Sequence, residues 1–259
     1  MENGMIPLTV IVIALNEEHN IGDCLDGVNW ADEIILVDSG SKDATVTLAE
    51  QHGAKVFVRS WQGFSDAKTF AVSKSRNNWI LWLDADERVS PELADEIRLL
   101  LKETPSKAAY SLARRAFFLG RWIRHSGWYP GRVVRLFDKN FAVFSSASVH
   151  EGLVVRGDTG EINADILHFT DPNLYHYMQK FNRYTSLASN ESFAAGKRFR
   201  ILDVLLRPLW LFFKMYFLRL GFLDGIEGLI LALLSSAYVF TKYSKLWEAW
   251  SASPSSRRT

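Results

Sequence analysis

The sequence has a single cysteine, Cys24, which excludes an intrachain disulfide and a zinc site built from thiolates. Proline and glycine are also sparse, at 7 and 16 of 259 residues, while 48% of the residues are apolar. This is not the composition of a collagen-like, low-complexity or wholly disordered chain. The sequence therefore predicts a folded protein in a cytosolic setting, with one large domain or one domain and an appendage.

The whole chain lacks an excess of charge of either sign, because 30 Lys and Arg face 29 Asp and Glu. A formal net charge of +1 argues against a protein that coats nucleic acid, and we expect no nucleic-acid partner. The charge is distributed unevenly, however. Residues 197–259 carry ten Lys or Arg and four Asp or Glu, which gives +6 and leaves 20 minus 25, or −5, for the first 196 residues. The difference predicts two parts with different partners.

The N-terminus lacks the basic start and the cleavage pattern of a secretory signal, since Glu2 is acidic and the apolar run 6–15 ends in Asn16-Glu17-Glu18. We interpret the run as a strand. Short apolar runs then alternate with amphipathic stretches, which is typical of β-α-β units around a mostly parallel sheet. The predicted strands are Leu8–Ala14, Glu33–Val37, Lys55–Val58 and Trp79–Leu83, and the predicted helices are 17–28, 43–52 and 64–76.

Two helix starts carry capping signals. Asn16 is placed to cap the first predicted helix, and Ser90 is followed by Pro91 at the first position of a further helix. Beyond residue 107 the pattern changes to short strands broken by turn residues, which predicts an antiparallel extension of the sheet. These strands are Ala109–Ala113, Val133–Phe137 and Glu161–Phe169, and a helix is predicted at 173–195.

The basic C-terminal part has two strongly apolar segments. Ile201–Leu220 is apolar nearly all round, with a narrow, mainly cationic stripe of Arg200, Asp203, Arg207 and Lys214. A core helix is one interpretation, but a helix lying among anionic lipid headgroups explains both features. The second run, Gly228–Thr241, has 14 uncharged residues, fewer than the roughly 20 that cross a bilayer. We therefore expect these helices to lie on a membrane rather than span it.

Acidic and amide side chains follow three of the predicted strands. Asn16 and Glu17 follow the first, Asp38 the second, and Asp84 and Asp86 the fourth. The carboxyl edge of an open α/β sheet is where ligands bind. Two carboxylates at alternate positions suit one divalent cation, Mg²⁺ or Mn²⁺, which prefers oxygen ligands and often bridges to phosphates.

Three segments carry a family resemblance: VIVIALNEEHNI, IILVDSGSKDAT and WILWLDADE. Together they resemble the nucleotide-sugar-binding half of family 2 inverting glycosyltransferases, which have the GT-A fold. The resemblance implies an α/β fold in which Asn16 and Glu17 lie against the nucleotide and Asp38 binds the base or ribose. It also implies that Asp84 contacts ribose and that Asp86 holds the metal on the diphosphate.

Two cations between the third and fourth predicted strands, Lys68 and Arg76, are candidates to approach the nucleotide. A solvated helix face is the alternative for both. The expected organisation is then a GT-A domain over residues 1–196, membrane-associated helices over 197–250 and a flexible tail over 251–259.

The later part of the chain is similar to the lipopolysaccharide-core branch of this family in HSGWYPGRVVRLF, VHEGL and ILHFTDPNLYHYMQKFNRY. This branch implies transfer of glucose from UDP-glucose to an inner-core heptose, on a lipid-linked acceptor at the cytoplasmic face of the bacterial inner membrane. The chain departs from the WYPD-like run by having Gly131, which argues against an acidic role there. It lacks the QxxRW motif of processive synthases, which favours transfer of a single sugar.

Inversion requires a base that takes the proton of the acceptor hydroxyl. The resemblance implies Glu151 for this role, with His150 as the competing base because imidazole titrates near neutrality. His168 is expected to reach the diphosphate or metal, although a structural histidine is the alternative. The expected acceptor wall consists of Trp128, Tyr129 and Arg135, since aromatic faces suit sugars and Arg suits anionic groups.

Three other functions remain as alternatives. A polyprenyl-phosphate glycosyltransferase would have the same fold and also need a basic membrane helix, but the HSGW and VHEG segments argue against it. A nucleotidyltransferase would need a glycine-rich basic loop after the first strand, where the chain has Ala14-Leu15-Asn16-Glu17-Glu18. A non-catalytic membrane scaffold predicts broken acidic clusters, and these clusters are intact.

Overall fold

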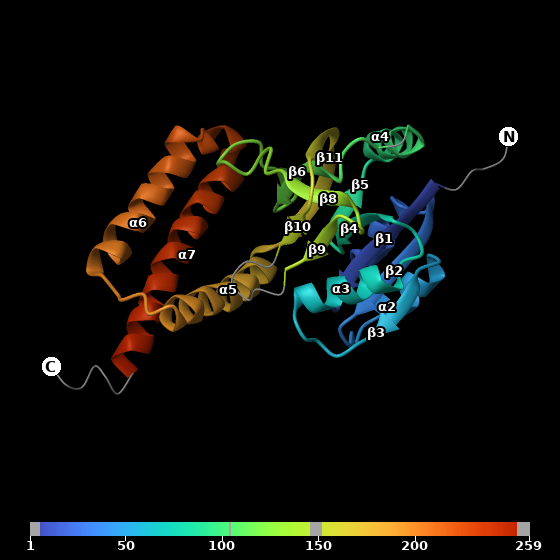
Figure 1. Cartoon of the computed structure of the whole chain (residues 1–259). Helices are drawn as coiled ribbons and strands as arrows, with labels where there is room; N and C mark the ends of the chain where they lie inside the picture. The colour runs from blue at the N-terminus through green and yellow to red at the C-terminus, as the bar shows by residue number, and fades with distance from the viewer. Residues whose placement is uncertain (1–5, 104, 146–151, 253–259) are drawn as a thin grey trace. The chain divides into compact units, whose positions relative to one another are not determined.

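The computed structural model describes residues 6–103, 105–145 and 152–252 (Figure 1). These residues form two compact units. The first comprises the chain up to Arg115 together with Gly131–His168, and the second comprises Ala116–Pro130 and the chain from Phe169 onward. The predicted boundary between residues 196 and 197 falls inside the second unit.

A mixed sheet of nine strands organises the chain, in the order β3-β2-β1-β4-β8-β6-β11-β5 with β7 paired to β6. The four predicted parallel strands are confirmed, because β1 pairs in parallel with both β2 and β4, and β2 pairs in parallel with β3. They are β1 (Ile6–Ala14), β2 (Ala31–Asp38), β3 (Lys55–Val58) and β4 (Trp79–Asp84).

The predicted antiparallel extension is also confirmed, since β8 pairs antiparallel with β4 and β6, and β11 pairs antiparallel with β5. Two further strands, β9 and β10, form a separate antiparallel pair. The bounds are β5 (Glu87–Val89), β6 (Ala109–Phe118), β7 (Arg121–Trp122), β8 (Val133–Asp138), β9 (Ala142–Phe144), β10 (Leu153–Val155) and β11 (Thr159–Asp171).

Both faces of the parallel strands are covered, which explains why β1 is apolar at nearly every position rather than alternating. Val10 and Val12 pack in a cluster with residues of α1, α2 and α4, whereas Ile11 and Ile13 pack with residues of α3. The four helices are α1 (Ile21–Asp26), α2 (Thr45–Gln51), α3 (Phe64–Lys74) and α4 (Pro91–Lys102).

One predicted helix start is confirmed and one is wrong. Ser90 caps α4, since its hydroxyl accepts a hydrogen bond from the amide of Leu93. Asn16 does not cap α1, which begins at Ile21. Asn16 instead has a φ of 56°, in the left-handed region that asparagine tolerates better than most residues. Its side chain accepts a hydrogen bond from the amide of Lys42 at 2.9 Å.

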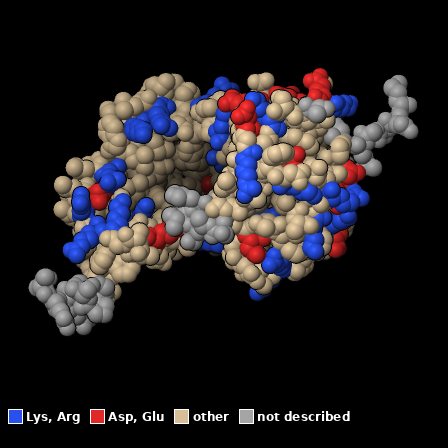
Figure 2. Space-filling model, viewed as in Figure 1, with Lys and Arg blue, Asp and Glu red and all other residues tan. Residues whose placement is uncertain are grey.

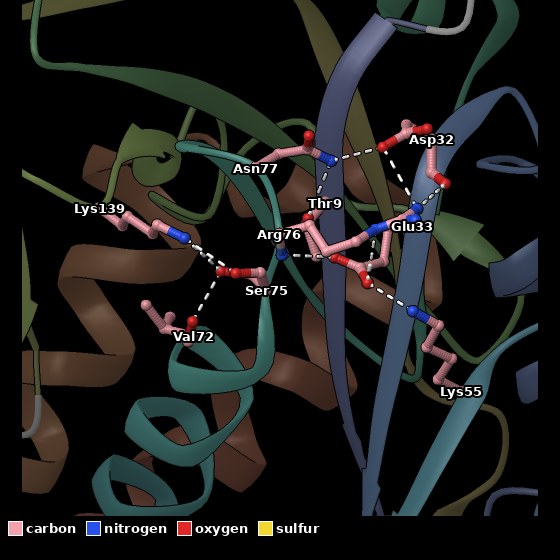
Figure 3. A network of polar contacts seen from close by, with 9 residues as sticks. All are labelled: Thr9, Asp32, Glu33, Lys55, Val72, Ser75, Arg76, Asn77 and Lys139. Carbon is pink, nitrogen blue, oxygen red and sulfur yellow. Dashed lines mark hydrogen bonds and ion pairs between the residues drawn. The ribbon is translucent and has the colours of Figure 1, made fainter.

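A buried carboxylate, Glu33, lies near the amino end of β2, at the amino-terminal edge of the parallel strands (Figure 3). It accepts hydrogen bonds from the hydroxyl of Thr9, the backbone amide of Arg76 and the ammonium of Lys55, each at 2.8 Å. Burial alone would raise the pKa of Glu33, but these hydrogen bonds outweigh it and hold the pKa below its ordinary value. Arg76 also pairs with Asp32, so the structure assigns Arg76 to this structural network and not to a nucleotide.

Three long helices dominate the second unit: α5 (Leu174–Ala194), α6 (Ile201–Phe213) and α7 (Gly225–Ala252). A π-helical turn, η1 (Lys214–Leu218), and a 3-10 turn, η2 (Gly221–Asp224), connect α6 to α7. In Figure 1, α7 lies beside both α5 and α6. Polar contacts join the helices, including those from Ser236 to the carbonyl of Pro208 (2.8 Å) and from Lys245 to Asn182 (2.8 Å).

The helices of the second unit expose an extensive apolar surface. Figure 2 shows uncharged residues over most of this part, with separate groups of Lys and Arg. Within the part of the chain that the structure describes, one helix, Gly221–Ala252, is long and apolar enough to cross a membrane by length and composition. The 14-residue uncharged run therefore lies inside a longer helix, and its shortness no longer argues against a spanning segment. The apolar side chains of α6 that are at least half exposed are Ile201, Leu202, Leu205, Leu206, Leu209 and Trp210.

Candidate functional site

The register of the parallel strands brings the acidic clusters to one edge of the sheet. Ala14 at the end of β1 pairs with Asp38 at the end of β2, and Ile13 pairs with Asp84 at the end of β4. Asn16 follows two residues after Ala14. The carboxyl edge of the first unit thus carries one amide and several carboxylates within neighbouring strands, the usual place for a ligand in such a sheet.

Asp38 organises the loop that follows β2. Its side chain accepts hydrogen bonds from the amides of Gly40 and Ser41, both at 2.8 Å, and from the hydroxyl of Ser41. Ser41 in turn accepts a hydrogen bond from the amide of Asn16 at 2.8 Å. Hydrogen bonds therefore link the loop after β1 to the loop after β2. Asp38 is 1% exposed, so in this structure its carboxylate is engaged with the backbone and hydroxyl of this loop.

Glu17 joins the same edge to α2. Its backbone amide donates to the hydroxyl of Thr45 at 2.8 Å, and its carboxylate accepts a hydrogen bond from Asn20, also at 2.8 Å. The neighbouring Glu18 accepts a hydrogen bond from the amide of Ala44 at 3.0 Å. Hydrogen bonds to side chains, rather than hydrogen bonds of the sheet, hold the loop after β1. These contacts fix the positions of Asn16 and Glu17.

The structure changes the interpretation of Arg135, which sequence reasoning placed in an acceptor wall. Arg135 is 3% exposed and forms ion pairs with Asp84 at 2.6 Å and with Glu87 at 2.5 Å. Because β8 lies beside β4 in the sheet, Arg135 points to the end of the neighbouring strand. It is therefore a positioning residue for Asp84 and does not present its guanidinium to an acceptor.

Glu87 is the residue of this cluster that sequence reasoning missed. It is fully buried, and its carboxylate also accepts a hydrogen bond from the amide of Asp84 at 3.1 Å. Burial raises the pKa of Glu87, Arg135 opposes the rise and Asp84 adds to it. For Asp84, burial would also raise the pKa, but the charges of Arg135 and Lys68 outweigh it and lower the pKa below its ordinary value. Asp84 is therefore held as a carboxylate.

Lys68 is 9% exposed, which rules out the solvated helix face that was its alternative interpretation. Its ammonium lies 3.7 Å from the centre of the Trp82 ring, and the guanidinium of Arg135 lies 4.0 Å from the same centre. Cations over an aromatic face are stabilised by the ring quadrupole. Two positive charges are thus held next to the carboxylates that end β4.

Replacing Arg135 by Met should destabilise the first unit. The change leaves Asp84 and Glu87 without their shared cation, and removing one partner of a buried ion pair costs about 3 kcal/mol or more. We expect this loss in the free energy of unfolding measured with urea at pH 7. Adding Glu87→Gln should recover part of it, because the buried charge is then removed. Equal stabilities of the Arg135→Met protein and the wild type would contradict this interpretation of the cluster.

Asp86 and His168 meet beside this cluster. His168 of β11 pairs with Glu87 of β5 in the sheet, and its Nε2 lies 3.4 Å from Oδ2 of Asp86. Each side chain is 18% exposed. Among the described residues no three acidic, His or Cys side chains form a preassembled metal site. Carboxylate and imidazole donors fit Mn²⁺ or Mg²⁺ when substrate phosphates and water supply the other ligands.

The two aromatic residues of the expected acceptor wall lie in the second unit. Trp128 packs edge-on against Phe118, with ring centres 6.2 Å apart, and Tyr129 packs against Trp122 at 5.5 Å. Tyr129 is 37% exposed. The expected bases, Glu151 and His150, lie outside the described residues.

The profile of glycosyl transferase family 2 matches residues 9–206 of the chain. The chain belongs to this family. It is 28% identical over 250 residues to the lipopolysaccharide core biosynthesis glycosyltransferase LpsC of Rhizobium meliloti (strain 1021), covering 94% of this chain and 93% of LpsC. It is 30% identical over 257 residues to an uncharacterized glycosyltransferase of Rickettsia felis, covering 95% and 91% of the two chains.

Solved structures also resemble the chain in part. Mannosyl-3-phosphoglycerate synthase from Rubrobacter xylanophilus has a TM-score of 0.38 and 26% identity, over 42% of this chain and 40% of that one. A glucosyl-3-phosphoglycerate synthase from Mycobacterium tuberculosis, in complex with Mn²⁺, UDP and glucosyl-3-phosphoglycerate, has a TM-score of 0.35 and 22% identity. That match covers 42% of this chain and 43% of the solved one. The mixed sheet of the first unit is GT-A-like, as family membership and the observed strand order together show.

Proposed function

We propose that this family 2 glycosyltransferase moves a single glucose residue, with inversion, from UDP-glucose to an inner-core heptose of a lipid-linked lipopolysaccharide precursor. The observation that carries the proposal is the gathering of Asp38 and Asp84 at one edge of the parallel sheet, with Asp86 in the turn that follows Asp84. The similarity to LpsC along nearly the whole chain supports the lipopolysaccharide core as the acceptor class. We place the reaction at the cytoplasmic face of the inner membrane.

In this proposal the first unit binds the donor. Asn16, Glu17 and Asp38 lie against the nucleotide, and Asp84, held as a carboxylate by Arg135, contacts the ribose. Asp86 and His168 would hold a divalent cation, which stabilises negative charge on the diphosphate leaving group when bound. Lys68 adds a fixed positive charge near the same carboxylates.

The second chemical requirement is a base for the acceptor. The acceptor oxygen attacks the anomeric carbon from the face opposite the diphosphate, the bond to the diphosphate breaks, and the acceptor hydroxyl loses its proton. We propose that Glu151 accepts this proton, with His150 as the alternative base. Only one sugar is transferred per acceptor, in keeping with the absence of QxxRW from the sequence.

We further propose that the second unit binds the surface of an anionic membrane without spanning it. Its support is the exposed apolar face of α6 together with the +6 charge of residues 197–259. Arg207 pairs with Asp203 along α6 at 2.5 Å, so the stripe on this helix is partly neutralised and other cations contribute most of the attraction.

Binding to vesicles containing phosphatidylglycerol should weaken as salt increases. Each Lys or Arg near an anionic surface contributes about 1 kcal/mol, and this attraction is screened over a Debye length of about 8 Å at physiological ionic strength. Flotation of the purified protein with vesicles at 0.05 and 0.5 M NaCl measures the effect. Retention that resists both high salt and carbonate, with a C-terminal tag accessible from the periplasm, would instead establish a spanning α7.

The test of the function is transfer of labelled glucose from UDP-glucose to lipopolysaccharide truncated at the inner core. We expect one glucose per acceptor, in β linkage to heptose. Transfer to polyprenyl phosphate and not to the truncated core would replace this proposal by the polyprenyl-phosphate alternative. Binding to membranes with no transfer to either acceptor would favour the scaffold.

A further inference from the structure

A pocket of about 400 Å³ lies wholly within the second unit, between the loop Ser126–Pro130 and helical residues 177–239. Its walls combine three aromatic residues, two cations and two serines, from Trp128, Tyr177, Tyr238, Lys214, Arg219, Ser126 and Ser235. Small-molecule sites usually have volumes of about 300–1,000 Å³. The pocket is therefore large enough for a sugar ring with a charged substituent.

The charge of the pocket has one sign. Lys214 and Arg219 are both cations, and no Asp or Glu belongs to the described residues that line it. Ammonium and guanidinium groups bind phosphates and carboxylates through charge-assisted hydrogen bonds. The aromatic rings offer apolar faces with polar edges, which suit the faces of a sugar. The lining also includes the apolar residues Leu211, Met215 and Val239, so it suits a ligand with apolar faces and an anionic group, and an anionic saccharide has both.

Ser126 provides an independent observation. It is 3% exposed, and its hydroxyl has no hydrogen-bond partner in the described part of the chain. A buried polar group without a partner costs about 1–3 kcal/mol, and such groups are uncommon in folded proteins. Ser126 also has a φ of 57°, which disfavours a non-glycine residue. Ser126 is among the residues that line the pocket, and a ligand that reaches its buried hydroxyl would supply the missing partner.

The loop that carries Ser126 is held firmly in place. Asp224, 2% exposed, accepts hydrogen bonds from the amides of Arg124 (3.1 Å) and His125 (2.9 Å), and its side chain also contacts Nδ1 of His125 at 2.9 Å. The amide of Ser126 donates to the carbonyl of Arg219 at 2.9 Å. Gly127 has a φ of 80°, which favours glycine, and a Cβ there would displace the side chain of Arg219 from its present position. The pocket wall is thus pre-organised, which favours specific binding.

We propose that this pocket binds the anionic group, phosphate or carboxylate, of a charged sugar in the lipid-linked acceptor, through Lys214, Arg219 and Ser126. The inference rests on the proposed function, because it assumes a saccharide acceptor anchored in a membrane. Leu209 and Trp210, on the helix that precedes Lys214, are 67% and 59% exposed. The unit therefore combines a saccharide pocket with an apolar surface for the bilayer in which the acyl chains of the acceptor reside.

The first test uses deacylated, truncated lipopolysaccharide core saccharide as the probe, measured by calorimetry without any membrane. Lys214→Met should weaken its binding about tenfold, the typical effect of losing one charge-assisted hydrogen bond. Arg183→Met removes an exposed cation of α5 that does not line the pocket, so it is the matched control and should not change the affinity. Ser126→Ala should weaken binding while leaving the melting temperature equal or higher, because it removes a buried hydroxyl without a partner.

Two comparisons separate the possible sources of the anion. The same saccharide stripped of its phosphates and carboxylates should bind the wild type and Lys214→Met equally. Vesicles of phosphatidylglycerol should lose as much affinity with Arg200→Met, which removes an exposed cation of residues 197–259 outside the pocket, as with Lys214→Met. The proposal is overturned if Arg183→Met and Lys214→Met bind the charged saccharide alike, or if Lys214→Met weakens binding to vesicles alone, which would make the pocket a phospholipid headgroup site.

Binding of UDP-glucose is measured in parallel on every variant. It should be unchanged, because the pocket and the donor residues belong to different units of the chain. A wild type that binds the charged saccharide through Lys214 but no nucleotide sugar would contradict the proposed function and leave the saccharide pocket standing. The two ideas therefore fail in different experiments.

Discussion

Replacing Asp86 by Ala is expected to lower the rate of sugar transfer by about 10³-fold or more, since a metal ion supplies several kcal/mol of charge stabilisation in the transition state. The structure places the Asp86 carboxylate beside His168 at the carboxyl edge of the sheet. Without this carboxylate the cation would be held poorly at the diphosphate. Removal of divalent cations from the wild type with EDTA should have a comparable effect, reversed by Mn²⁺ or Mg²⁺.

The matched control for this prediction is Asp95→Ala. Asp95 lies on α4, is 77% exposed and pairs with Arg98, so its loss should leave the transfer rate unchanged. Circular dichroism checks that both variants fold. An Asp86→Ala protein that transfers sugar at a near-normal rate after metal removal would show that the reaction does not depend on a metal at this position.

The second large effect is expected from Glu151→Gln, which should lower kcat by about 10² to 10⁴ while UDP-glucose binds with its usual Kd. Glutamine is nearly isosteric with glutamate but cannot take the proton of the acceptor hydroxyl. If Glu151 is the base, the variant separates donor binding from catalysis. The measurement is kcat for transfer beside the Kd of the donor, on the same preparation.

Two further variants make this prediction specific. Glu161→Gln changes a carboxylate that is 66% exposed and pairs with Arg132, so it should leave kcat unchanged. His150→Ala should cost less than Glu151→Gln. The reverse ranking would make histidine the base, and a Glu151→Gln enzyme within a few-fold of the wild type would remove Glu151 from the mechanism.

The sequence predicted the parallel half of the fold because its signals are local. Each strand is a short apolar run followed by polar residues, and parallel strands necessarily bring their carboxyl ends to one edge. The placement of Asp38 and Asp84 at that edge follows from the strand register alone. The cap of α4 was equally predictable, since Ser90 and Pro91 are adjacent in the chain.

Long-range pairing explains what sequence reasoning could not supply. Arg135 meets Asp84 and Glu87 across 51 and 48 residues, a distance over which spacing carries no information. The only sequence signal for Glu87 was its position as an acidic residue directly after Asp84-Ala85-Asp86. The contact of His125 with Asp224 spans 99 residues and places the HSGW segment in the helical unit. The position of an aromatic or basic residue near a sequence motif therefore does not predict which of the two units contains it.

The most direct test of the central claim is a donor screen with the purified wild-type protein, because it needs no acceptor. Binding and slow hydrolysis are measured across UDP- and GDP-sugars, with and without Mn²⁺. The account predicts metal-dependent binding and hydrolysis of UDP-glucose, lost in Asp86→Ala. Failure of the folded protein to bind any nucleotide sugar in the presence of metal would contradict it.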